Sequence, residues 1–205
     1  MAVMLIAITG SIGSGKTYVA KIFEQSNIPV IYADNIAKDL ISNDFEVNCQ
    51  VKQFFNIKKI DFKLIKQQIF KNKKKRLFLE KLVHYKVLKI IKSKILQSKS
   101  HCFVLELPMI GNLFNILKIL AINKLIFINC SRNIQISRVM HRDKLSKSEV
   151  MLIIKAQLYP NKILKIADYL LNGDNLQLLQ MQAVELCSLL KNTSKNIEVY
   201  PNEQK

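Results

Sequence analysis

The sequence is poor in the residues that mark membrane, secreted and metal-stabilised proteins. It contains no tryptophan, four prolines and five glycines in 205 residues, and only 8% of its residues are aromatic. No stretch approaches the roughly 18 uninterrupted apolar residues of a membrane-spanning helix. We therefore expect no membrane partner.

Cysteine is also scarce. The four cysteines lie far apart, with no CxxC pair and no histidine at ligand spacing: Cys49, Cys102, Cys130 and Cys187. This spacing argues against a zinc site or a disulfide framework. Cys102 and Cys130 stand in apolar runs and are predicted to be buried thiols. The pattern suits a reducing compartment, and we expect a cytoplasmic protein. The apolar stretch from Met1 to Ile8 lacks a basic segment and a cleavage site, and so predicts a strand rather than a signal peptide.

Arginine is the scarcest basic residue. The formal charge is +17, yet it comes from 28 lysines and only four arginines, beside 28 isoleucines. A protein that grips nucleic-acid phosphates more often uses the guanidinium fork. A surplus of lysine and isoleucine is what drift in an AT-rich coding sequence produces. The charge predicts attraction to anionic substrates, and we expect no specific nucleic-acid partner.

Strand-type runs alternate with helical spacing along the chain. Strands are predicted at 3–9, 29–32, 102–107, 125–130 and 169–171, and helices at 17–26, 35–42, 62–70, 73–96 and 175–191. Asp34 stands where it could cap the second helix. This alternation predicts an α/β fold with a parallel sheet. One domain is expected over residues 1–192, with a helical insertion at about 45–98 and a flexible tail at 193–205.

One motif carries clear chemistry. Residues 10–17 read Gly-Ser-Ile-Gly-Ser-Gly-Lys-Thr and satisfy the pattern G-x-x-x-x-G-K-[ST], between a predicted strand and a predicted helix. Glycines let successive N–H groups point inward at phosphate oxygens. Lys16 can reach the β- and γ-phosphates of ATP, and the Thr17 hydroxyl can bind Mg²⁺. The predicted ATP-binding residues of this loop are Ser11, Ile12, Gly13, Ser14, Gly15, Lys16 and Thr17.

The loop alone leaves several classes open, namely small-molecule kinases, GTPases, and ATPases that act on nucleic acid or protein. The sequence has no Asn-Lys-x-Asp guanine signature and no long ATPase core. A chain of 205 residues fits a small-molecule kinase best. The predicted fold is accordingly a parallel-sheet P-loop kinase core with an inserted helical region.

Further segments match one family in order and spacing. They are the loop at 8–17, Pro29–Asp34, Phe70 with Arg76, Leu79, Glu80 and His84, Leu107–Ile110, the run of Gln135, Arg138, Arg142, Asp143, Leu145, Ser146 and Gln157, and Ala167–Tyr169. In these segments the sequence resembles the dephospho-coenzyme A kinase family over nearly the whole core. Tyr32, Tyr85 and the pair Gly111-Asn112 depart from the family pattern.

The resemblance implies transfer of the ATP γ-phosphoryl group to the ribose 3′-hydroxyl of dephospho-CoA, the last step of coenzyme A synthesis. ATP and dephospho-CoA are then the partners, Mg²⁺ is the cofactor, and the protein is a monomer or small homo-oligomer. The helical lid of this fold class is also what the family resemblance implies.

Three residues are predicted to be catalytic. Asp34 follows the second strand, at the rim where a parallel sheet presents its site, and could accept the hydroxyl proton. Lys16 and Arg142 would hold phosphates. Arg138 and Arg142 lie four residues apart on one helical face, and their forks suit a lid at about 138–158 that closes over ATP. A surface ion pair of Arg142 with Asp143 is the plainer alternative.

The predicted acceptor site combines residues from several segments: Asp34, Phe70, Arg76, Leu79, His84 and Pro108. Without the resemblance, a lone histidine such as His84 is most often a packed or surface residue. Two other functions stay open. One is another P-loop kinase, such as a nucleoside monophosphate kinase, although that class more often has a proline within the glycine loop. The other is a degenerate P-loop protein that only binds nucleotide.

Overall fold

The computed structural model describes residues 3–109, 113–157 and 160–196. Its centre is a parallel sheet of five strands in the order β2-β3-β1-β4-β5. The strands are β1 (Met4–Gly10), β2 (Val30–Tyr32), β3 (Cys102–Glu106), β4 (Lys124–Asn129) and β5 (Tyr169–Asn172). The predicted α/β class with a parallel sheet is confirmed.

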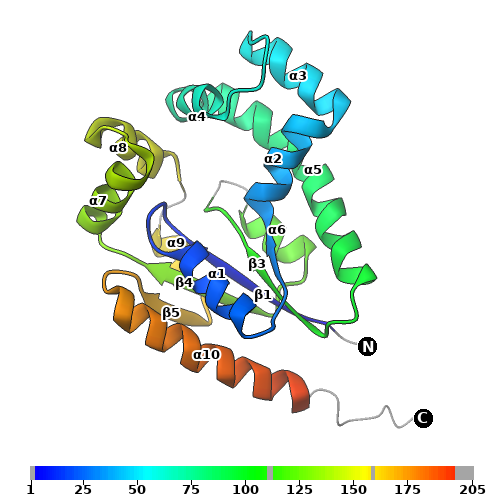
Figure 1. Ribbon diagram of the computed structural model, residues 1–205, viewed down its shortest axis with the longest axis vertical. Helices are drawn as coiled ribbons and strands as arrows, with labels where there is room; N and C mark the ends of the chain where they lie inside the picture. Colours follow the sequence, from blue (N-terminus) through cyan, green and yellow to red (C-terminus); the bar gives the residue numbers. More distant parts are fainter. Residues whose placement is uncertain (1–2, 110–112, 158–159, 197–205) are drawn as a thin grey trace.

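Helices cover both faces of this sheet, as the continuous apolar run of β1 requires. Leu5 and Ala7 face one core, and Ile6 and Ile8 face the other. The second core packs against α1 (Lys16–Gln25) and α10 (Leu176–Asn196), which lie side by side in Figure 1. The first core contains side chains of α2 (Ala33–Asn43), α5 (Lys73–Gln97), α6 (Leu113–Ile119) and α9 (Pro160–Leu164).

Helices α2 to α5 connect β2 to β3 and rise away from the sheet (Figure 1). Between α2 and α5 run α3 (Phe45–Phe55) and α4 (Phe62–Lys71). Asp44, Asp61 and Asn72 accept hydrogen bonds from backbone N–H groups in the first turns of α3, α4 and α5, which explains where these helices begin.

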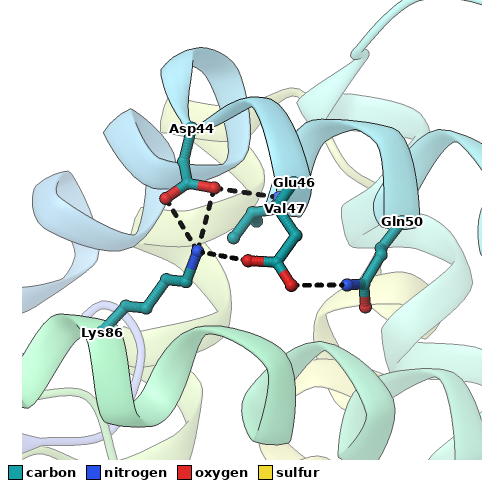
Figure 2. A network of polar contacts seen from close by, with 5 residues as sticks. All are labelled: Asp44, Glu46, Val47, Gln50 and Lys86. Carbon is teal, nitrogen blue, oxygen red and sulfur yellow. Dashed lines mark hydrogen bonds and ion pairs between the residues drawn. The ribbon is translucent and has the colours of Figure 1, made fainter.

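An ion-pair network ties the start of α3 to α5. Lys86 of α5 lies 2.9 Å from a carboxylate oxygen of Asp44 and 3.0 Å from one of Glu46 (Figure 2). Asp44 also accepts the N–H of Val47. The network stands at the surface and does not line the main cavity of the molecule.

A helical hairpin follows β4. It consists of α7 (Arg132–Asp143) and α8 (Lys147–Ala156), whose contact buries Ile136, Val139 and Val150. Ser146 and Glu149 form a capping box that starts α8. In Figure 1 the hairpin stands beside the sheet, and α8 contacts α4. The hairpin and the helical insertion therefore meet where α8 contacts α4.

Two sequence-based expectations about helix ends were wrong. Asp34 is not a helix cap, because β2 passes directly into α2 and Tyr32 occupies the cap position. Asp34 lies in the first turn instead, where a carboxylate interacts favourably with the helix dipole. Helix α10 continues to Asn196 rather than ending near 191. Gly111, Asn112 and residues 197–205 lie outside the described residues.

Cys102 and Cys130 are buried, as predicted, and burial raises the pKa of their thiols to about 11 and about 12. Among the helices that the structure describes, none combines the length and the apolar character needed to cross a membrane.

Candidate active site

The glycine loop joins the carboxyl end of β1 to the start of α1. Gly13 and Gly15 have φ angles of +75° and +106°, a region that residues with a side chain rarely adopt. A Cβ atom on Gly13 would also lie 2.9 Å from Cγ2 of Val139 in the hairpin. Glycine is thus required here by conformation and by the close approach of α7.

Lys16 opens α1 and folds back over the loop. Its Nζ donates to the carbonyl oxygens of Gly10 at 2.9 Å and Ser11 at 3.2 Å. Burial lowers the pKa of Lys16, while the nearby carboxylates of Glu106 and Asp34 act to raise it. The ammonium therefore lies in a partly desolvated position between two acidic side chains, where electrostatic interactions are stronger than in water.

Glu106 was missed in the sequence-based site. It is the last residue of β3, and its Oε1 accepts a hydrogen bond of 3.1 Å from the Thr17 hydroxyl. Burial raises the pKa of Glu106, opposed by Lys16 and by the Thr17 hydrogen bond. A signal was available, because Glu106 is an acidic residue that ends an apolar strand. The ends of neighbouring parallel strands share one edge of a sheet.

The oxygens at this point fit a hard cation. The Thr17 hydroxyl and the carboxylates of Glu106 and Asp34 are the donor types that Mg²⁺ prefers. No group of three or more His, Cys, Asp and Glu side chains within the described residues could hold a metal. Mg²⁺ usually takes only one or two carboxylates and shares its other positions with water and substrate phosphates. The residues present therefore suit Mg²⁺ bound together with a nucleotide.

A cavity of about 840 Å³ extends from the glycine loop to the helical insertion. This volume lies within the usual range for small-molecule sites. Every predicted acceptor residue lines it: Asp34, Phe70, Arg76, Leu79, His84 and Pro108. Ile12, Gly13, Lys16, Thr17 and Arg142 also line it, whereas Ser11, Ser14, Gly15 and Arg138 do not. The tertiary structure thus brings most of the predicted residues, which are remote in sequence, to one cavity.

Asp34 faces this cavity without a protein partner. Its side chain forms no hydrogen bond or ion pair with the other residues that the structure describes. It lies near enough to Lys16 and Glu106 to affect the pKa of both. An exposed, unpaired carboxylate beside Lys16 can accept a proton from a bound hydroxyl.

Helix α5 presents a row of polar side chains to the cavity, consisting of Arg76, Glu80 and His84 at four-residue spacing. The Arg76 and Glu80 side chains lie 3.9 Å apart, and burial raises the pKa of Glu80. Nε2 of His84 is buried and has no hydrogen-bond partner within the described residues. Val87, one turn further on, and Ile91, two turns further on, make the wall apolar. This wall of the cavity, polar at Arg76 to His84 and apolar beyond, suits a ligand that is polar at one end and less polar at the other.

The two hairpin arginines have different surroundings. Arg142 lines the cavity and donates to both oxygens of Asp143, at 2.6 and 3.0 Å. Arg138 donates to the backbone carbonyls of Gly13, Gly173 and Asp174. Arg138 thereby joins the glycine loop to the segment after β5. Its predicted contact with ATP stays a prediction.

The hairpin also touches the glycine loop through Gln157. Its Oε1 accepts the N–H of Ile12 at 3.0 Å, and Gln157 lines the cavity. The residue was noticed in the sequence only as part of the resemblance. A hydrogen bond therefore connects the end of α8 to the glycine loop.

The family model that matches the chain is that of dephospho-CoA kinase, and it spans residues 4–178. The chain belongs to the dephospho-CoA kinase family. The match includes the glycine loop, the insertion, the hairpin and β5, which are the segments that build the cavity. The predicted resemblance is confirmed.

Individual proteins agree with this family. A dephospho-CoA kinase of Legionella pneumophila (strain Lens) is 31% identical over 176 residues, which cover 83% of this chain and 86% of that protein. The structure of a dephospho-CoA kinase from Campylobacter jejuni has a TM-score of 0.60 and 25% identity, and the match covers 94% of this chain and 98% of that one. TT1252 from Thermus thermophilus, at 23% identity and the same coverage, has a TM-score of 0.77 and supports the fold.

The dephospho-CoA kinase family gives the reaction. The chain is a phosphotransferase that phosphorylates dephospho-CoA in the last step of coenzyme A biosynthesis, as the sequence predicted. The predicted P-loop kinase fold is confirmed with it.

Proposed function

We propose that the chain transfers the γ-phosphoryl group of ATP to the ribose 3′-hydroxyl of dephospho-CoA, with Asp34 as the base and Lys16 and Arg142 as the phosphate-binding cations. The observation that carries this mechanism is the shared cavity. Lys16, Thr17, Glu106 and Asp34 line it together with Arg76, Glu80 and His84 of α5, which supports a reaction between a nucleotide and an acceptor bound in one space.

The chemical step follows from this arrangement. The 3′-oxygen of the acceptor attacks the γ-phosphorus, the bond from that phosphorus to the β,γ-bridging oxygen breaks, and ADP leaves. Asp34 accepts the proton of the attacking hydroxyl, since it is an unpaired carboxylate at the cavity wall. Phosphoryl transfer needs mainly positioning and charge stabilisation, which one carboxylate and two cations supply.

Lys16 and Arg142 would bind the transferred phosphoryl group from two sides. Arg142 is close enough to Lys16 to lower the pKa of the lysine. Two cations at this separation repel each other in the protein alone, and phosphate oxygens between them relieve that repulsion. The guanidinium adds a fork that can hold two oxygens of the phosphoryl group at once.

Mg²⁺ would be held by the Thr17 hydroxyl, with Glu106 and Asp34 as the nearby carboxylates. When bound, it neutralises charge on the β- and γ-phosphates. Glu106 contributes in the protein itself by fixing the rotamer of Thr17 through their hydrogen bond. ATP would contact the loop at Ser11 to Thr17, with Ser11, Ser14 and Gly15 acting through their backbone N–H groups.

The acceptor would extend along α5. Arg76 suits its anionic diphosphate, and Glu80 and His84 suit the amides of its pantetheine arm. Phe70, Leu79 and Pro108 would line the sides. We further propose a single domain, expected from the sequence over 1–192 and extended here to the end of α10 at Asn196, in which 45–98 is the acceptor-binding insertion and 138–158 the lid. The protein would act in the cytoplasm as a monomer or small homo-oligomer, without a specific nucleic-acid partner.

A coupled assay of ADP release tests the mechanism, with dephospho-CoA, AMP, CMP and adenosine as acceptors and with Mg²⁺ present or chelated. We expect turnover with dephospho-CoA only, dependent on Mg²⁺. Turnover only with a monophosphate would instead indicate a nucleoside monophosphate kinase. Binding of RNA that survives physiological salt would contradict the absence of a nucleic-acid partner.

A further inference from the structure

Asp143 connects the hairpin to the helical insertion at the cavity. It is the last residue of α7, and its carboxylate accepts two hydrogen bonds from the neighbouring Arg142. The same carboxylate lies 3.1 Å from Nζ of Lys66, which is 77 residues away on α4 of the insertion. One acidic side chain therefore bridges the hairpin that carries the phosphate-binding arginine and the insertion on the acceptor side.

The burial of Asp143 sets it apart from an ordinary surface ion pair. Its side chain is 19% exposed, whereas that of Arg142 is 60% exposed. The Arg142 hydrogen bonds, with Lys66 adding to them, hold the pKa of Asp143 at about 2. Exposed pairs contribute little because both side chains stay mobile in water. Here the acid is fixed by two cations from two elements, so its geometry is better defined.

The other charges of the cavity do not by themselves set the position of Arg142. Lys16 and Lys66 line the cavity and repel the guanidinium, whereas Asp34 and Glu106 line it and attract the guanidinium. Asp143 is the acid to which Arg142 is bonded within the described residues. A guanidinium held at both Nε and a terminal nitrogen has its plane and direction set. The remaining N–H groups lie on the two terminal nitrogens, and this outer edge stays available for two phosphate oxygens.

We propose that Asp143 is a positioning residue for phosphoryl transfer, which holds the Arg142 fork toward the transferred phosphate and, through Lys66, connects that fork to the acceptor-binding insertion. The inference rests on the proposed role of Arg142. Asp143 touches no reacting atom, and its effect on the reaction passes through Arg142. Positioning of this kind matters because small displacements of a charge-stabilising group cost large factors in rate.

The test is a double-mutant cycle on turnover of ATP and dephospho-CoA. Asp143→Asn keeps the size of the side chain and removes its charge, and we expect kcat to fall about tenfold. Arg142→Ala is expected to lower kcat about 100-fold or more. Adding Asp143→Asn to Arg142→Ala should then change kcat by less than about twofold, because the residue through which Asp143 acts is gone.

A matched control and one further variant complete the experiment. Asp44→Asn removes the same charge from another Lys–Asp pair, the network of Figure 2, which lies outside the cavity. Asparagine can still cap α3, so kcat should stay at the wild-type value. Lys66→Gln removes the bridge from Asp143 to α4 and one cation of the cavity lining, and should lower kcat about threefold, less than Asp143→Asn. If Lys66→Gln causes the same threefold loss when it is added to Asp143→Asn, the link through Lys66 is contradicted.

Three results would overturn the proposal: wild-type kcat in Asp143→Asn, an undiminished tenfold loss when that change is added to Arg142→Ala, or an equal loss in Asp44→Asn. Thermal unfolding of each variant shows whether a loss of kcat reflects loss of folded protein. An absence of turnover by the wild-type chain would instead contradict the proposed reaction. An Arg142→Ala variant with wild-type kcat would contradict the role of Arg142.

Discussion

The Thr17 hydroxyl donates a hydrogen bond of 3.1 Å to the carboxylate of Glu106, a residue 89 positions further along the chain. The pair joins the first turn of α1 to the carboxyl end of β3, at the edge of the sheet where the cavity begins. It also orients the side chain that is expected to bind Mg²⁺. Substitutions of the residues at this edge of the sheet should therefore change stability or activity.

Replacing Glu106 should change stability and activity in opposite directions. Its raised pKa means that the folded chain holds the Glu106 proton more tightly than the unfolded chain. Stability therefore falls as pH rises from the ordinary carboxyl pKa through the raised value, and the ionised group costs its full amount above it. At pH 7, Glu106→Gln should raise the melting temperature by about 1–4 °C and lower kcat at least tenfold.

Calorimetry at pH 7 and at pH 4 checks the first half of that prediction. The gain in melting temperature should shrink at pH 4, where Glu106 of the wild type is largely protonated in the folded chain. A variant that is less stable than the wild type at pH 7 would contradict the assigned cause, which is burial of the charged form.

Removing the loop lysine should abolish the reaction. Lys16→Ala takes away the cation that lies between Glu106 and Asp34, and we expect kcat/KM for ATP to fall on the order of a thousandfold. Lys21→Ala is the matched control, because Lys21 also lines the cavity but has no predicted role. Wild-type turnover in Lys16→Ala would refute the assignment of the ATP site.

The proton acceptor can be separated from the ATP site. Asp34→Asn should lower kcat about 100-fold or more while the Kd for ATP changes less than threefold, since a general base acts in the chemical step. Single-turnover kinetics together with calorimetric titration of ATP measures both quantities. Asp39→Asn, on the same helix but outside the cavity lining, should behave like the wild type. Near-normal kcat in Asp34→Asn would remove this residue from the base role.

The acceptor end of the cavity is tested at His84. Its buried Nε2 is available for an acceptor amide, so His84→Ala should raise the KM for dephospho-CoA about fivefold, the equivalent of one hydrogen bond. The KM for ATP should stay unchanged. Tyr85→Ala is a neighbouring control, because Tyr85 is 74% exposed and does not line this cavity. A rise in both KM values would indicate loss of structure rather than loss of an acceptor contact.

Most of the fold could be predicted because its signals are local. The apolar run of β1 and the loop after it, Gly10 to Thr17, follow from hydrophobic spacing and from the pattern of glycines. The start of α2 was predicted wrongly. Asp34 is a residue type that often caps helices, but β2 passes directly into α2 and leaves Tyr32 at the cap position. Where a helix begins or ends depends on the segments next to it, and the spacing of apolar residues along the sequence does not give this information.

Part of the candidate site could likewise be predicted from the sequence, and part of it could not. Lys16, Thr17 and Asp34 were predicted from a motif and a strand end, and the α5 residues that line the cavity were predicted from the resemblance. Glu106 was missed, and so were the bridge from Asp143 to Lys66 and the bond from Gln157 to Ile12. Each of these contacts joins residues at least 77 positions apart.

The sequence by itself determined that this chain forms a parallel α/β sheet, that its first loop has the pattern of a phosphate-binding loop, and that it resembles one family of kinases. These properties follow from short stretches whose residue types permit few conformations. Only the tertiary structure decided that the Glu106 carboxylate orients the Thr17 hydroxyl and that Arg138 donates a hydrogen bond to Gly13 of the glycine loop. It also decided that Arg142 lines the cavity beside Asp143. Those roles depend on which helices and strand ends meet, and that is set by packing across the whole core.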